Sequence, residues 1–264
     1  MEKGMNLIGK IAWVGGGSKG IGFAIARQLA EAGATVVLFA RKEAELILAV
    51  GQLPKPAFQE HSFRVIDFGD LDEVKNQVIV WKREFPTVHI LVNNSGGPAG
   101  GLLVEESTEK LASVFSQHVL ASQIWVQAVV EGMKKAGYGR ILNIISVSVR
   151  QPIQGLGVSN TVRAAMASWS KTLSRELGPF SITVNSILPG FTATGRLAEV
   201  NQLRAKMQDK SIEEIEKELI GQVPIGRFVQ PDEVAALAVF LCSSLAGAMT
   251  GNSIAVDGGF LTTL

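Results

Sequence analysis

A run of closely spaced glycines near the start of the chain has the composition of a phosphate-binding turn: Gly15-Gly16-Gly17-Ser18-Lys19-Gly20-Ile21-Gly22. It follows a short apolar run and precedes apolar residues at helical spacing, which predicts a turn from a strand into a helix. Glycines let such a turn close. They also let a pyrophosphate reach the amides at the helix N-terminus, whose partial positive charge favours an anion. The run therefore predicts a dinucleotide site with contacts from Gly16, Ser18, Lys19, Gly20, Ile21 and Gly22, and a merely structural turn is the alternative.

The residues at the end of the second predicted strand indicate which dinucleotide is bound. An acid there would bind the free ribose hydroxyls, whereas an arginine would accept a phosphate. The chain has Arg41 and Lys42 at this point and no acid, and Lys19 adds a cation from the glycine run. We therefore expect NADP(H) rather than NAD(H), with Arg41 at the phosphate. The alternative is that these residues are ordinary surface bases.

Motifs along nearly the whole chain resemble those of the short-chain dehydrogenase/reductase family. The glycines have its G-x-x-x-G-x-G spacing, although Gly15 stands where the family usually has threonine. Other matching segments are Asp67-Phe68, Asn93-Asn94-Ser95-Gly96, Pro189-Gly190 with Thr194, Pro224-x-Gly226-Arg227, Pro231-x-Glu233-Val234-Ala235 and Val256-Asp257-Gly258-Gly259. The resemblance implies cofactor contacts from Asp67, Phe68, Asn94, Gly96, Pro189, Gly190, Thr192 and Thr194.

The same resemblance implies a reaction centre of asparagine, serine, tyrosine and lysine, of which this chain keeps one residue. Ser146 fills the place of the serine, which orients the substrate carbonyl in the family. Ser159 stands at the tyrosine position, Arg163 at the lysine position and His118 at the asparagine position. The only tyrosine of the chain, Tyr138, precedes the fifth predicted strand, at the wrong end for the site. No displaced tyrosine can therefore take the role.

These substitutions change the proton chemistry more than the binding chemistry. Tyrosine has a reference pKa of about 10 that a nearby cation can lower, whereas the hydroxyl of Ser159 is a poor general acid. Positioned acid–base catalysis contributes typically about 10²–10⁴-fold, so its loss would slow a carbonyl reduction heavily. Arg163 stays charged and cannot relay a proton, but its fork can hold the cofactor ribose or a substrate carboxylate. His118 has an ordinary pKa near neutrality, and a structural histidine behind the cofactor is the alternative.

Two functions are compatible with these residues. The chain resembles an atypical subgroup close to 3-oxoacyl-acyl-carrier-protein reductases with an imperfect tetrad. This implies an NADP(H)-dependent oxidoreductase that acts on a carbonyl or alcohol by an altered mechanism. Water, His118 or the substrate would then supply the proton. The alternative is a non-catalytic cofactor-binding protein or a silent subunit of an oligomer, and the glycine run does not decide between them.

Short apolar runs alternate with helical patterns, and this rhythm predicts crossover units around a parallel sheet. Strands are predicted at residues 11–14, 35–39, 63–66, 90–92, 140–145, 182–187 and 253–256. Helices are predicted after the glycine run and at residues 71–84, 108–135, 160–177 and 231–243. The expected fold is α/β, a Rossmann-type doubly wound seven-stranded parallel sheet with helices on both faces, in a single domain over residues 1–264.

One charged segment, at about residues 191–222, breaks the rhythm and contains a polar helical pattern from Ser211 to Glu218. Open α/β sheets bind ligands beyond the carboxyl ends of their strands, so an insertion at this point is expected to cover a ligand as a lid. A solvated surface excursion is the alternative.

Composition limits the partners and the setting. The formal charge is +1, from 25 basic and 24 acidic residues without a long block of one sign, so neither a nucleic acid nor a membrane surface is an expected partner. A small-molecule substrate is favoured. The single cysteine, Cys242, excludes an internal disulfide and a multi-cysteine metal cluster, and no metal site is expected. With no apolar leader at the start, we expect a cytoplasmic protein, and the resemblance implies a homotetramer or homodimer.

Overall fold

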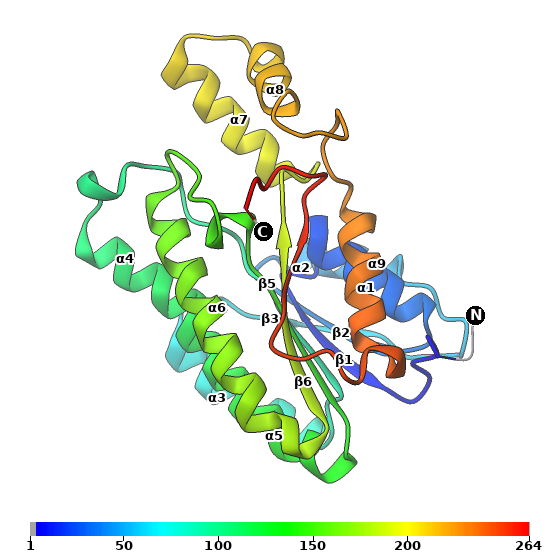
Figure 1. Cartoon of the computed structure of the whole chain (residues 1–264). Coiled ribbons are helices and arrows are strands. Elements are labelled where there is room, and N and C mark those ends of the chain that lie inside the picture. Colours follow the sequence, from blue (N-terminus) through cyan, green and yellow to red (C-terminus); the bar gives the residue numbers. More distant parts are fainter. Residues whose placement is uncertain (1–3, 264) are drawn as a thin grey trace.

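The computed structural model describes residues 4–263 and contains, within that range, one sheet of seven parallel strands. Their order is β3-β2-β1-β4-β5-β6-β7, so the direction of winding reverses between β1 and β4 (Figure 1). The strands are β1 Ile11–Gly15, β2 Thr35–Ala40, β3 Ser62–Val65, β4 Ile90–Asn93, β5 Gly139–Ile144, β6 Ile182–Pro189 and β7 Ser253–Val256. The predicted fold class is confirmed, and each predicted strand is present with small shifts at its ends.

Helices cover both faces of this sheet. They are α1 Gly20–Glu31, α2 Glu43–Gly51, α3 Leu71–Glu84, α4 Thr108–Phe115, α5 Ala121–Ala136, α6 Gly157–Leu177, α7 Gly195–Gln208, α8 Ile212–Ile220 and α9 Pro231–Cys242. Figure 1 shows α1 and α9 packed together on one face and α3, α5 and α6 on the other. Each face has its own buried core, with Leu29 and Leu241 in the first and Trp13 and Trp125 in the second. In the described part of the chain, no helix has the length and apolar character needed to cross a membrane.

The helices differ from the predicted pattern in two ways. The helix expected over residues 108–135 is divided into α4 and α5 by a π-helical turn, Ser116–Leu120. Helices α2 and α7 are not predicted by the sequence pattern, because neither has a clear apolar stripe. Helix α2 is apolar on several sides, and α7 buries only Asn201 and Ala205. The polar pattern from Ser211 does form a helix, α8, and Ser211 and Glu214 make a capping box at its start.

A buried polar network ties the central strands to α6. Asn93 Nδ2 donates to Asn143 Oδ1 across β4 and β5 at 2.8 Å, and Asn143 Nδ2 donates to Ser170 Oγ on α6 at 3.0 Å. Ser186 on β6 donates its hydroxyl to the same Ser170 oxygen at 3.1 Å. Because it is costly to leave a buried polar group without a hydrogen-bond partner, these hydrogen bonds fix the position of α6 relative to β5. Residues near the end of β5 and the start of α6 are positioned as a result.

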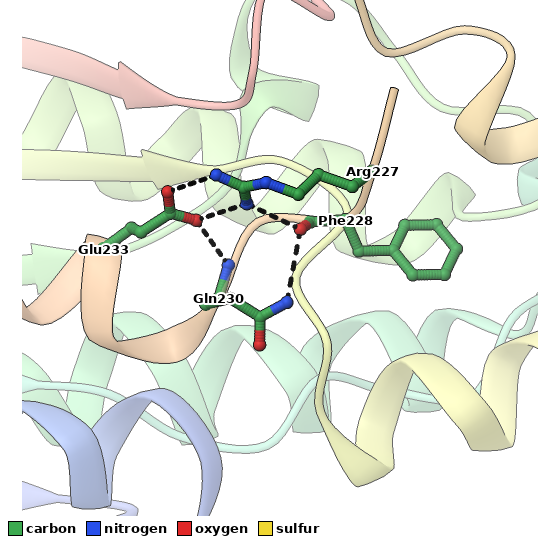
Figure 2. Close-up of polar contacts among 4 residues, drawn as sticks. All are labelled: Arg227, Phe228, Gln230 and Glu233. Carbon is green, nitrogen blue, oxygen red and sulfur yellow. Dashed lines mark hydrogen bonds and ion pairs between the residues drawn. The ribbon is translucent and has the colours of Figure 1, made fainter. Parts of the chain in front are cut away.

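The segment from α7 to α8 projects beyond the carboxyl ends of the strands (Figure 1). Ile215 and Leu219 of α8 pack with Ala205 of α7 in a small core of their own. The chain returns to the main body through a bridge between Thr192 and Val229 and through the turn before α9. In that turn Arg227 forms a two-bond ion pair with Glu233, at 2.8 and 2.7 Å, and Glu233 also accepts from the Gln230 amide at 2.8 Å (Figure 2).

Gly22→Ala is expected to damage the turn between β1 and α1, since a Cβ at Gly22 would lie 2.2 Å from the Gly16 carbonyl oxygen. Forced overpacking of this kind costs roughly 1–3 kcal/mol. Gly51→Ala, at the last residue of α2, is the matched control because a Cβ there meets nothing within 4 Å. Urea unfolding of both variants checks this prediction. Equal free energies of unfolding for Gly22→Ala and Gly51→Ala would contradict the close contact between Gly22 and the Gly16 carbonyl.

Candidate functional site

A cleft of about 580 Å³ lies at the carboxyl edge of the sheet, where the winding reverses. The turn after β1, the ends of β2, β4, β5 and β6, and the inner side of α7 contribute its walls. Doubly wound sheets bind ligands at this kind of switch point. The fold therefore brings the predicted cofactor residues and most of the predicted reaction centre to one cavity.

The glycine turn presents backbone rather than side chains to the cleft. Gly16 and Gly20 have φ of 56° and 58°, a conformation that suits glycine. A Cβ at Gly16 would lie 2.6 Å from Asn94 Nδ2, and that same amide donates to the Gly15 carbonyl at 3.0 Å. Asn94 thus anchors the turn from β4, in a loop that lacks the family's threonine. The result is a cradle at the start of α1 whose shape and amides suit a pyrophosphate.

The end of the cleft beside β2 carries three cations, and one acid lies in contact with two of them. Arg41, Lys42 and Lys19 line it, as predicted from the sequence. Glu45, in the first turn of α2, lies among them, 3.1 Å from Lys42 Nζ and 3.9 Å from Lys19 Nζ, and it accepts from Ser18 Oγ at 3.2 Å. The hydrogen bond from Lys42 lowers the pKa of the Glu45 carboxyl, so the acid is ionised at neutral pH. Sequence reasoning missed Glu45, because it lies beyond the strand end in an unpredicted helix.

The remaining predicted cofactor residues also line this cleft. They are Asp67, Phe68, Gly96, Pro189, Gly190, Thr192 and Thr194 together with Arg163. Phe68 packs edge-on against Trp125 of the second core, with ring centroids 4.8 Å apart. Thr194 caps α7 by accepting from the Leu197 amide at 3.3 Å, which fixes where this helix begins.

Two serine hydroxyls stand at the positions where the resemblance implies reaction chemistry. Ser146 follows β5, and its Oγ accepts from the Ser148 amide at 3.1 Å, which orients the oxygen. No described residue accepts the Ser146 hydroxyl proton, so that hydroxyl can donate to a ligand in the cleft. Ser159, in the first turn of α6, lines the same cavity.

Arg163 is buried at the base of the cleft, with only 8% of its surface exposed. Its guanidinium donates to the Ile144 carbonyl at 2.8 Å and to the Ser95 carbonyl at 3.5 Å. Burial, and then the nearby charge of Arg196, lower its pKa to about 10. The side chain is still cationic at neutral pH, and it is held by backbone oxygens from two strand ends.

The structure does not bring His118 to the cleft. Its ring lies in the π-helical turn behind Ser95, with Nδ1 2.8 Å from Ser95 Oγ, and borders a separate cavity of about 20 Å³. Burial, and then the charge of Arg163, lower its pKa to about 2, because both disfavour a second positive charge. His118 is neutral at working pH and cannot supply a proton there. The structural interpretation of this histidine fits its surroundings better than the catalytic one.

The sole tyrosine is equally remote. Tyr138 lies just before β5, at the opposite end of the strand from Ser146, and its hydroxyl donates to the Cys242 carbonyl. Burial raises its pKa to about 12. Among the described residues that line the cleft there is no histidine, cysteine or tyrosine.

Helix α7 adds charged residues that sequence reasoning did not single out. Arg196, Glu199 and Arg204 of α7 all line the cleft. The charge of the segment was visible in the sequence, but which side chains face inward depends on how α7 packs.

The fold and this cleft define a class, the doubly wound α/β proteins with a dinucleotide-type site at the switch point of the sheet. The family described as Enoyl-(Acyl carrier protein) reductase matches residues 16–261. The chain therefore belongs to the short-chain dehydrogenase/reductase family, whose members include NAD(P)-dependent oxidoreductases, as the motifs predicted.

Known proteins align with nearly the whole chain. The 3-oxoacyl-[acyl-carrier-protein] reductase of Chlamydia trachomatis is 33% identical over 253 residues, which cover 96% of this chain and 98% of that protein. L-sorbose reductase from Gluconobacter frateurii, solved with NADPH and L-sorbose, superposes with a TM-score of 0.92 at 32% identity, over 98% and 99% of the two chains. An NAD⁺-bound xylitol dehydrogenase superposes with a TM-score of 0.88 at 26% identity, over 96% and 99%.

The low pKa of His118 gives an acid-stability prediction. The unfolded histidine binds a proton below its ordinary pKa of about 6.5, whereas the folded one does not until about pH 2. Stability from this group is therefore full above pH 6.5 and falls by roughly 1.4 kcal/mol per pH unit as the pH drops below it. His118→Asn should show a shallower acid loss in urea unfolding between pH 7 and 5. Identical slopes for the two proteins would contradict a neutral buried ring.

Proposed function

We propose that this protein is an NADP(H)-dependent oxidoreductase that interconverts a carbonyl and an alcohol without a tyrosine proton donor. The observation that carries this proposal is one continuous cleft. It joins the glycine cradle and the cations beside β2 to Ser146, Ser159 and Arg163. A protein that only sensed the nucleotide would not need oriented hydroxyls at the far end of the same cavity.

The residues of the cleft fit a nicotinamide dinucleotide. The glycine cradle and the start of α1 suit the pyrophosphate, and Arg41 suits a phosphate on the adenosine ribose. When bound, the cofactor supplies or accepts a hydride. We assign Arg163 to the cofactor ribose, because it lines the cleft and two of its five N–H groups are used by backbone carbonyls, which leaves others to donate to ribose hydroxyls.

Ser146 is the residue we assign to the substrate carbonyl. Its oxygen is fixed by the Ser148 amide, which leaves its hydroxyl proton to donate to the carbonyl oxygen. That hydrogen bond favours the charge that develops on the oxygen during reduction. Ser159 adds a second hydroxyl in the same cavity.

The proton then comes from water or from the substrate. Arg163 stays cationic with its guanidinium bonded to two backbone carbonyls, and His118 is neutral and outside the cleft, so we assign the proton to neither. The loss of a positioned acid lowers the rate by roughly 10²–10⁴-fold compared with a site that has one. Slow turnover with tight cofactor binding is the expected kinetic character.

The test is direct: purified protein is titrated with NADPH and then offered a panel of ketones, aldehydes and 3-oxoacyl thioesters. We expect NADPH to bind and to be consumed slowly with at least one class of substrate. Tight NADPH binding with no consumption across the panel would overturn the proposal. It would favour the alternative, a non-catalytic binding protein or a silent subunit.

Ser146→Ala is expected to lower kcat by about 10²-fold, because an oriented donor to the carbonyl oxygen is lost. The dissociation constant for NADPH should change little. Ser148→Ala is the matched control, since the Ser148 side chain does not line the cleft and its backbone amide stays in place. An equal loss of kcat in both variants would mean that Ser146 acts only through local structure.

Glu45→Gln is expected to tighten NADPH binding by roughly 3- to 10-fold and to leave NADH binding nearly unchanged. The carboxylate competes with a ribose phosphate for Lys42 and Lys19, and a partly exposed charge contact of this kind contributes about 1 kcal/mol. Glu43→Gln, in the same helical turn but outside the cleft lining, is the control. Fluorescence titrations check both cofactors, and tighter binding of NADH alone would contradict the phosphate assignment.

A further inference from the structure

One face of α7 presents arginines to the cleft. Arg196, Val200 and Arg204 are four residues apart, a spacing that places side chains on one side of a helix. All three line the cavity. The inner face of the lid therefore carries two guanidinium groups on either side of an apolar residue.

Arg196 is already held by the protein. It donates to the Pro98 carbonyl in the loop after β4, and it forms an ion pair with Glu199 at 3.3 Å. Its guanidinium also lies within 4.0 Å of the place a Cβ at Gly97 would occupy. These contacts join the start of the lid to the far wall of the cleft.

Arg204 differs, because no residue of the described chain, 4–263, makes a hydrogen bond or an ion pair with its guanidinium. The side chain is half-buried, and burial alone lowers its pKa. A cation that loses water without gaining a partner is destabilising. An anion bound in the cleft would offset that cost.

Each end of the cleft carries three cations, and acids accompany them at both ends: Glu45 and Asp67 beside β2, and Glu199 at the other end. Lys19, Arg41 and Lys42 stand at the end beside β2, where the cofactor phosphates fit. At the other end the charged residues that line the cavity are Arg163, Arg196 and Arg204, with Glu199 as the acid. Glu199 is paired with Arg196, and Arg163 is bonded to two carbonyl oxygens and assigned to the cofactor ribose, so Arg204 is the cation available to a substrate.

We propose that the substrate is an oxo acid, whose carboxylate is bound by Arg204 while its carbonyl lies toward Ser146. The planar fork of a guanidinium matches a carboxylate, and one unpaired guanidinium matches a single negative charge. This inference rests on the proposed reductase function for the role of the carbonyl. The carboxylate site itself can be tested without turnover.

The experiment is calorimetric titration of the protein–NADP⁺ complex with straight-chain oxo acids of five to eight carbons and with their methyl esters. We expect at least one acid to bind roughly 10- to 100-fold more tightly than its ester, the range for a charge-assisted pair. Arg204→Gln should remove this preference, and Arg204→Lys should keep part of it. The control is Lys206→Gln, which removes a cation from the same helix at an exposed position outside the cleft and should leave the preference intact.

Three outcomes would overturn the inference. The esters could bind as tightly as the acids, no acid could bind, or Arg204→Gln could weaken NADP⁺ instead, which would assign Arg204 to the cofactor. Even if a variant fails to fold, the comparison of acids with esters on the unaltered protein tests whether the cleft prefers a carboxylate. Failure of the reductase function would appear differently, as acids that bind the complex but never consume NADPH.

Discussion

The site depends on one buried cation, the Arg163 guanidinium, and on the two carbonyl groups that hold it. Arg163 comes from α6, whereas its partners are Ile144, the last residue of β5, and Ser95, which follows β4. The bonds therefore join α6 to the carboxyl ends of β4 and β5, next to the point between β1 and β4 where the winding of the sheet reverses. A buried charge is tolerated only when it is well satisfied, so this arrangement fixes the loops that line the cleft.

The same cation determines which chemistry the site can perform. Burial is the main reason that His118 is neutral, and the charge of Arg163 is the second. The charge of Arg196 lies close enough to repel that of Arg163, and an anionic ligand would relieve this repulsion. By resemblance, a lysine would hold the ribose and assist a neighbouring tyrosine, whereas this chain has Arg163 and Ser159 at the matching positions. In the proposed function these two residues bind and orient, because the arginine stays cationic and the serine hydroxyl is a poor acid, and solvent or substrate supplies the proton.

Much of the fold and the cofactor site could be predicted because their signals are local. Apolar runs predicted the strands, and the glycine turn predicted the start of α1 with its cradle. Other features depend on packing at a distance. Nothing local shows that Glu45 lies among the cations of Lys19 and Lys42, that α7 turns Arg204 inward, or that His118 lies behind Ser95. The sequence reveals a residue's type, whereas its exposure and partners follow from the assembled layers.

The most direct measurement is the transfer of deuterium from NADPH labelled at C4 of the nicotinamide. Each C4-epimer of the labelled cofactor is incubated with the purified protein and a carbonyl substrate, and the alcohol is analysed by mass spectrometry. Our account predicts deuterium on the carbinol carbon from one epimer, with Ser146→Ala reducing its yield. Saturated NADPH binding without deuterium in any product, from either epimer, would contradict a reductase that works without its tyrosine.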